Sequence, residues 1–164
     1  MKRREAFMAA ALGLVALVHP VSSFGSTLAD TVPRVKAAIV IVGTYKATDN
    51  PRFQLRGTGF VVGDGSQVVT NAHVLPESTG LSEAPALVVQ VRGADGRWQM
   101  RGVERLAHSD EYDLALLRME GPAVAALSLG DSTRVREGDE LAFTGFPIGG
   151  VLGYSPVTHR ALVS

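Results

Sequence analysis

Two β-type runs joined by four turn residues limit the fold more than any other feature. Residues 58–62 and 67–70 are rich in Val, Thr and Phe, and Gly63-Asp64-Gly65-Ser66 lies between them. Glycine adopts the positive φ angles that a tight turn requires, so this pattern predicts a β-hairpin. The hairpin is followed at once by a histidine, His73.

The rest of the chain continues this β pattern. Residues 86–92 and 97–107 flank a second Gly-rich turn, while residues 47–56 are polar and predict a loop. Beyond residue 25 no stretch keeps a helical period for the roughly 10–12 residues that a helix needs. The sequence therefore predicts an all-β chain of about eight short strands in a barrel or sandwich. The remaining strands are expected at residues 37–45, 114–119, 141–146 and 157–163.

The N-terminus has the order of an export signal. Lys2-Arg3-Arg4 is basic, residues 6–18 are apolar, and small residues at Ser23 and Gly25 follow. The apolar stretch is too short, at about 1.5 Å per residue, to cross a hydrocarbon core roughly 30 Å thick. We therefore expect residues 1–25 to be a cleaved signal peptide without a stable membrane span, and the mature protein to reach the periplasm, cell envelope or exterior.

Composition excludes several classes of function. Sixteen basic residues balance sixteen acidic ones, which argues against a nucleic-acid partner, and no phosphate-binding Gly-Lys-Ser/Thr run is present. Cysteine is absent, which excludes disulfides and thiolate metal sites. His108 and His159 lack the spacing of metal ligands. We expect no metal and no cofactor.

The segment around His73 resembles a known family. Residues 57–75 contain Gly57-Thr58-Gly59-Phe60, the hairpin and Thr70-Asn71-Ala72-His73. They resemble trypsin-like serine proteases, most closely the cysteine-free bacterial HtrA/Deg branch. The resemblance implies a trypsin-like double β-barrel over residues 33–164, with the first barrel and the first strands of the second. It also implies that His73 is the catalytic general base.

A second motif stands forty residues after His73. Residues 112–117, with Asp113 at their start, resemble the Asp-Leu-Ala-Leu-Leu segment of the same family. A histidine that uses one ring nitrogen as a base needs the other held as N–H by an acceptor. The resemblance implies that Asp113 is this acceptor.

The family's serine is not found among these residues. Residues 127–150 and 157–164 resemble the passage from the first barrel into the second, whereas the nucleophile belongs to a later Gly-Asn/Asp-Ser-Gly-Gly loop. Gly130-Asp131-Ser132 is followed by Thr133-Arg134 instead of two glycines. We interpret it as a turn and the protease domain as C-terminally incomplete.

The resemblance implies a serine endopeptidase that cleaves peptide or protein substrates by acyl transfer. The chain by itself is expected to be inactive because it lacks the nucleophile. The alternative is a truncated, non-catalytic β-barrel that serves as a binding or regulatory module. A barrel unrelated to proteases would require both motifs to be coincidental. The oligomeric state is left open.

Overall fold

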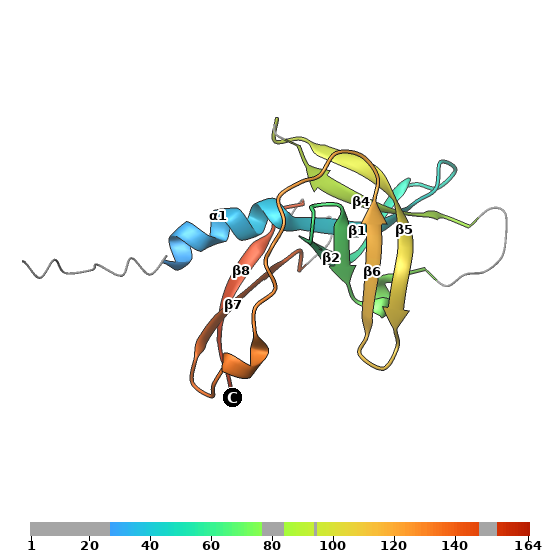
Figure 1. Cartoon of the computed structure of the whole chain (residues 1–164). Helices are drawn as coiled ribbons and strands as arrows, with labels where there is room; N and C mark the ends of the chain where they lie inside the picture. The colour runs from blue at the N-terminus through green and yellow to red at the C-terminus, as the bar shows by residue number, and fades with distance from the viewer. Residues whose placement is uncertain (1–26, 77–83, 94, 148–153) are drawn as a thin grey trace, which may run out of the picture.

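The computed structural model describes residues 27–76, 84–93, 95–147 and 154–164 (Figure 1). The expected signal peptide, residues 1–25, lies outside these ranges. None of the helices in them is long and apolar enough to cross a membrane. The elements in chain order are α1 (Leu28–Ala38), β1 (Ile39–Tyr45), β2 (Phe53–Val62), β3 (Gln67–Thr70), η1 (Ala72–Val74), β4 (Ala86–Arg92), β5 (Trp98–Ser109), β6 (Leu114–Met119), η2 (Ser132–Arg134), β7 (Glu140–Gly145) and β8 (Val157–Leu162).

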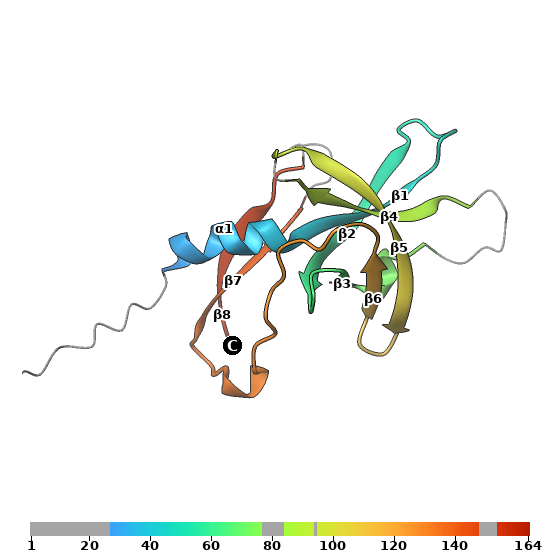
Figure 2. The ribbon, with the colours of Figure 1, turned by 45° about the horizontal axis from the view of Figure 1, so that its top comes forward.

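Six of these strands form a closed barrel in the order β1-β2-β3-β6-β5-β4. Every neighbouring pair is antiparallel. Strands β7 and β8 form a separate two-stranded sheet, which lies with α1 on one side of the barrel (Figures 1 and 2). The predicted all-β fold is confirmed, and its architecture is a closed six-stranded barrel with a separate two-stranded sheet.

Aliphatic side chains fill the barrel. Alternate residues of a strand point to the same face, so one face of each strand directs its side chains into the barrel. Gly59 of β2 leaves room for this packing, because a Cβ there would lie 2.7 Å from Val68 Cγ1. The fully buried members of this core include Val42, Val61, Val68, Val89 and Leu117.

A second apolar cluster lies outside the barrel. Ile39, Ile41 and Phe146 are buried there, and the ring of Trp98 lies 5.8 Å from that of Phe146 and 6.4 Å from that of Tyr154. Trp98 is thus a partly buried member of this second apolar cluster. The cluster holds the segment after β7 against the outer face of the barrel.

The prediction of no helix beyond the signal was wrong at α1. Thr27 and Asp30 form a capping box, in which the Asp30 N–H donates to Thr27 Oγ1 at 3.3 Å. This cap and the packing of Val35 against the outer cluster stabilise the helix despite Pro33 inside it.

The predicted loop at residues 47–56 also ends earlier than expected. Strand β2 begins at Phe53, which pairs with Tyr45 of β1. Its first residues alternate between half-buried and exposed. Their polar side chains face outward, which made the segment look like a loop, although the backbone pairs with β1.

Candidate active site

His73 lies in η1, directly after β3. Strand β3 ends at Thr70, whose hydroxyl donates to the Thr58 carbonyl at 2.9 Å. The next two apolar residues, Val74 and Leu75, are buried in the barrel core. They anchor the turn from inside, so the His73 side chain is left outside and is 71% exposed.

Asp113 closes the turn that precedes β6. Strands β3 and β6 are neighbours, with Thr70 opposite Ala115, so this turn lies beside η1. The backbone of Asp113 is left-handed, with φ of 49°, a region that Asp and Asn tolerate better than most residues. Its carbonyl accepts the Ala72 N–H at 3.1 Å. The barrel topology therefore joins two motifs that are forty residues apart in sequence.

The two side chains are in direct contact. His73 Nδ1 lies 2.6 Å from Asp113 Oδ2, and the His73 backbone N–H donates to Asp113 Oδ1 at 2.9 Å. A carboxylate on Nδ1 holds the proton at that nitrogen and leaves the Nε2 lone pair free to accept one. The arrangement can therefore act as a general base whose tautomer and orientation are fixed.

Two further residues, neither of them predicted as a site residue, support this pair and the turn that carries it. Asn71 Nδ2 donates to both the carbonyl and Oδ2 of Asp113, each at 3.1 Å. Arg56 of β2 donates from Nε to the Val74 carbonyl at 2.5 Å. Asn71 could have been suspected because it lies in the His73 motif. Arg56 gave no local signal, since its partner is eighteen residues away.

These contacts lower the pKa of Asp113 below 3.8. The largest cause is the His73 backbone N–H; the His73 ring and the Asn71 amide add to it, while partial burial opposes it. A lowered carboxyl pKa stabilises the fold at pH values above the pKa of the unfolded chain. That contribution is lost as the pH falls through the lower, folded-state pKa.

Asn71→Ala is expected to raise the pKa of Asp113 only part of the way toward the ordinary carboxyl value, because the larger contribution of the His73 backbone N–H remains. The measurement is an NMR titration of the Asp113 carboxyl carbon. Gln99→Ala, on an exposed part of β5, is the control and should not move the midpoint. An Asn71→Ala midpoint equal to that of the unchanged protein would show that the amide does not act on this carboxylate.

An open cavity of about 640 Å³ adjoins the pair. Its lining includes Arg56, Leu75, Arg105 and His108, and no serine, threonine or cysteine belongs to the described lining. Within the described ranges no group of three or more His, Asp or Glu could hold a metal ion. The cavity therefore offers the base no nucleophile from these residues.

The other candidates from the sequence lie elsewhere. Ser132 belongs to η2, which lies beside the β7–β8 hairpin and away from η1 in both views (Figures 1 and 2). Asp131 caps this turn by accepting the Thr133 N–H at 3.0 Å, in agreement with its interpretation as a turn. His159 stacks on Phe143, with 5.2 Å between the ring centres.

The chain is similar to several known proteins. The serine protease HTRA2, mitochondrial, of Drosophila grimshawi is 33% identical over 92 residues, and that of Drosophila ananassae is 32% identical. Each match covers 56% of this chain and 20% of the relative. The solved HtrA-type protease AlgW with tripeptide is 26% identical, with a TM-score of 0.61, over 83% of this chain and 39% of that one.

The family model of the trypsin-like peptidase domain matches residues 57–161, more than half of the chain. This range contains both His73 and Asp113. The chain therefore belongs to the trypsin-like peptidase family, and HtrA-type serine proteases are among its relatives.

Proposed function

We propose that this chain supplies the general base and the orienting carboxylate of a serine endopeptidase. The observation that carries the proposal is the 2.6 Å contact between His73 Nδ1 and Asp113 Oδ2. In the reaction, a serine hydroxyl attacks a peptide carbonyl while His73 Nε2 accepts its proton. Asp113 stabilises the imidazolium, which then donates the proton to the leaving amine, and water hydrolyses the acyl-enzyme.

The proposed nucleophile lies outside these 164 residues. The sequence contains no Gly-Asn/Asp-Ser-Gly-Gly run, and among the described residues no hydrogen bond occupies His73 Nε2. A largely exposed imidazole is compatible with a serine that approaches from another segment. That segment would also supply the backbone N–H groups that stabilise the oxyanion.

A fluorophosphonate probe tests this assignment, because it labels only activated serines. We expect no labelling of the 164-residue chain, and labelling once the chain is joined to a second barrel with a Gly-Asp-Ser-Gly-Gly loop. Labelling of the joined protein should disappear with His73→Ala and persist with Ser132→Ala. Labelling of the unjoined chain that Ser132→Ala removes would overturn the proposal. A joined protein that binds peptides but is never labelled would favour the non-catalytic module.

We also propose that the protein is exported and acts on peptide or protein substrates. Export rests on the basic, apolar and small-residue order of residues 1–25. N-terminal sequencing of the mature protein is expected to begin after Ser23 or Gly25. A mature protein that still begins at Met1 or Lys2 would contradict export through this signal.

A further inference from the structure

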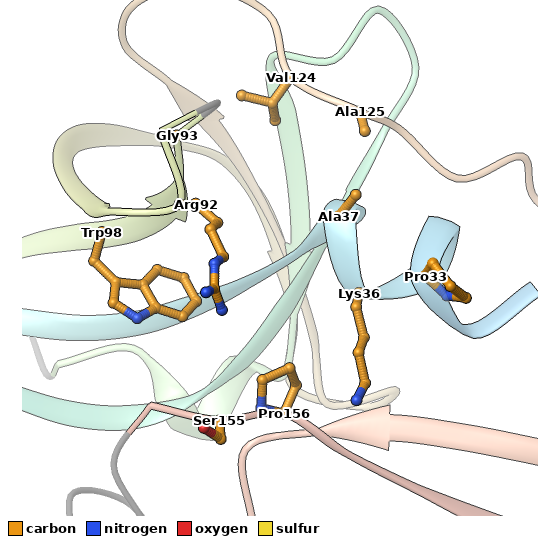
Figure 3. A pocket seen from close by; sticks show the side chains of 11 residues that line it. Pro33, Lys36, Ala37, Arg92, Gly93, Trp98, Val124, Ala125, Ser155 and Pro156 are labelled. Carbon is orange, nitrogen blue, oxygen red and sulfur yellow. The ribbon is translucent and has the colours of Figure 1, made fainter.

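A second cavity, distinct from the one at His73, lies between α1, the β4–β5 turn and the segment that leads into β8. We call it the Lys36–Arg92 pocket (Figure 3). Its volume is about 710 Å³, within the range of roughly 300–1,000 Å³ that is typical of small-molecule sites. None of its lining residues belongs to the cavity at His73.

Two cations, Lys36 and Arg92, line this pocket, and neither has an anionic partner in the described part of the chain. Lys36 comes from the last turn of α1 and Arg92 from the end of β4. Among the described residues neither forms an ion pair, and the described lining contains no Asp or Glu. In Figure 3 the guanidinium of Arg92 extends beside the Trp98 ring toward the segment that carries Ser155 and Pro156, and Lys36 lines the side of the pocket that α1 forms. Both positive charges therefore line the same open space, and no acidic residue of its described lining neutralises them.

The same pocket has a flat apolar wall. The guanidinium carbon of Arg92 lies 5.8 Å from the centre of the Trp98 ring, a cation–π distance. Edge contacts with Phe146 and Tyr154 hold that ring in place. Val124 and Pro156 add further apolar surface. The indole is thus fixed beside the charge, as a site for a ring-bearing ligand requires.

We propose that the Lys36–Arg92 pocket binds a small organic anion, in which a carboxylate or phosphate group is attached to a flat apolar body. The planar guanidinium of Arg92 suits the two oxygens of such a group, Lys36 adds a second positive charge, and the Ser155 hydroxyl can donate a hydrogen bond. The flat body packs on Trp98. A ligand held in this way connects α1, the barrel and the approach to β8.

The test uses the single tryptophan of the chain as a reporter. The indole N–H of Trp98 gives one NMR signal, which is followed during titration with 1-naphthoate, 1-naphthyl phosphate and the neutral 1-naphthamide. We expect saturable shifts with both anions and at least about tenfold weaker binding of the amide, since charge-assisted hydrogen bonds supply much of the affinity. The tighter of the two anions identifies the preferred head group.

Charge variants decide whether the effect belongs to this pocket. Lys36→Gln and Arg92→Gln are each expected to weaken naphthoate binding about tenfold or more. Arg34→Gln is the matched control, because Arg34 is exposed on the same helix but does not line the pocket. The dispersion of the backbone N–H signals in the NMR spectrum shows whether each variant is folded. If Arg92→Gln does not fold, the binding measurement on Lys36→Gln still tests the proposal. The proposal would be overturned if 1-naphthamide bound as tightly as 1-naphthoate, or if Arg34→Gln weakened naphthoate binding as much as Lys36→Gln. It would also be overturned if no ligand gave a saturable shift of the Trp98 signal.

Discussion

His73→Ala, placed in the chain joined to a second barrel with a Gly-Asp-Ser-Gly-Gly loop, is expected to lower kcat for peptide hydrolysis by about 10⁴–10⁶-fold if the proposed function holds. Substitutions in a Ser-His-Asp triad have effects on this scale, because the remaining groups cannot accept the serine proton. Asp113→Asn should cost about 10⁴-fold, since an amide favours the wrong tautomer of His73. Binding of substrate, measured as KM, should change far less than kcat.

The measurement is single-turnover cleavage of a fluorogenic peptide, which separates chemistry from binding. His159→Ala is the matched control, because this histidine stacks on Phe143 and has no contact with Asp113. It should retain activity close to that of the unchanged protein. A His73→Ala protein that keeps more than about one hundredth of the activity would remove His73 from the role of base.

Leu117→Ala is expected to lower the free energy of unfolding by about 2–5 kcal/mol, a large share of the roughly 5–15 kcal/mol of a typical domain. Leu117 is 0% exposed inside the barrel, so truncation removes buried methyl groups and leaves a cavity. Urea unfolding followed by Trp98 fluorescence measures the change.

Leu129→Ala provides the comparison for this truncation, because Leu129 is 76% exposed. Its effect on unfolding should stay within about 0.5 kcal/mol. Equal losses for the two leucines would mean that the barrel interior does not carry the stability attributed to it.

The strands were largely predictable because their signals are local. Residues 114–119 were expected as a strand and form β6 without a change of bounds. The closed order of the barrel was not predictable in this way, since the pairing of β3 with β6 depends on register between distant segments. The start of β2 at Phe53 was missed for a related reason. Its neighbours are polar, and only pairing with Tyr45 defines the strand.

Only the two principal residues of the candidate site were predictable from the sequence. Family-like motifs identified His73 and Asp113, but not the left-handed backbone of Asp113 or the two hydrogen bonds from Asn71. Arg56 lies outside both motifs, and its role depends on the approach of β2 to the Val74 carbonyl. Such supporting contacts are fixed by tertiary packing. Motifs therefore point to the proposed catalytic pair before the residues that hold it.

Thr58 of β2 forms hydrogen bonds with two segments, one that follows β7 and one at the end of β3. Its hydroxyl accepts the Phe146 N–H at 2.9 Å, and its carbonyl accepts the Thr70 hydroxyl at 2.9 Å. The first bond locates the segment after β7, and the second locates the strand that ends before His73. We therefore expect a displacement of β2 to act on both segments, so that the position of the segment after β7 depends on the same strand as the position of the turn that carries His73.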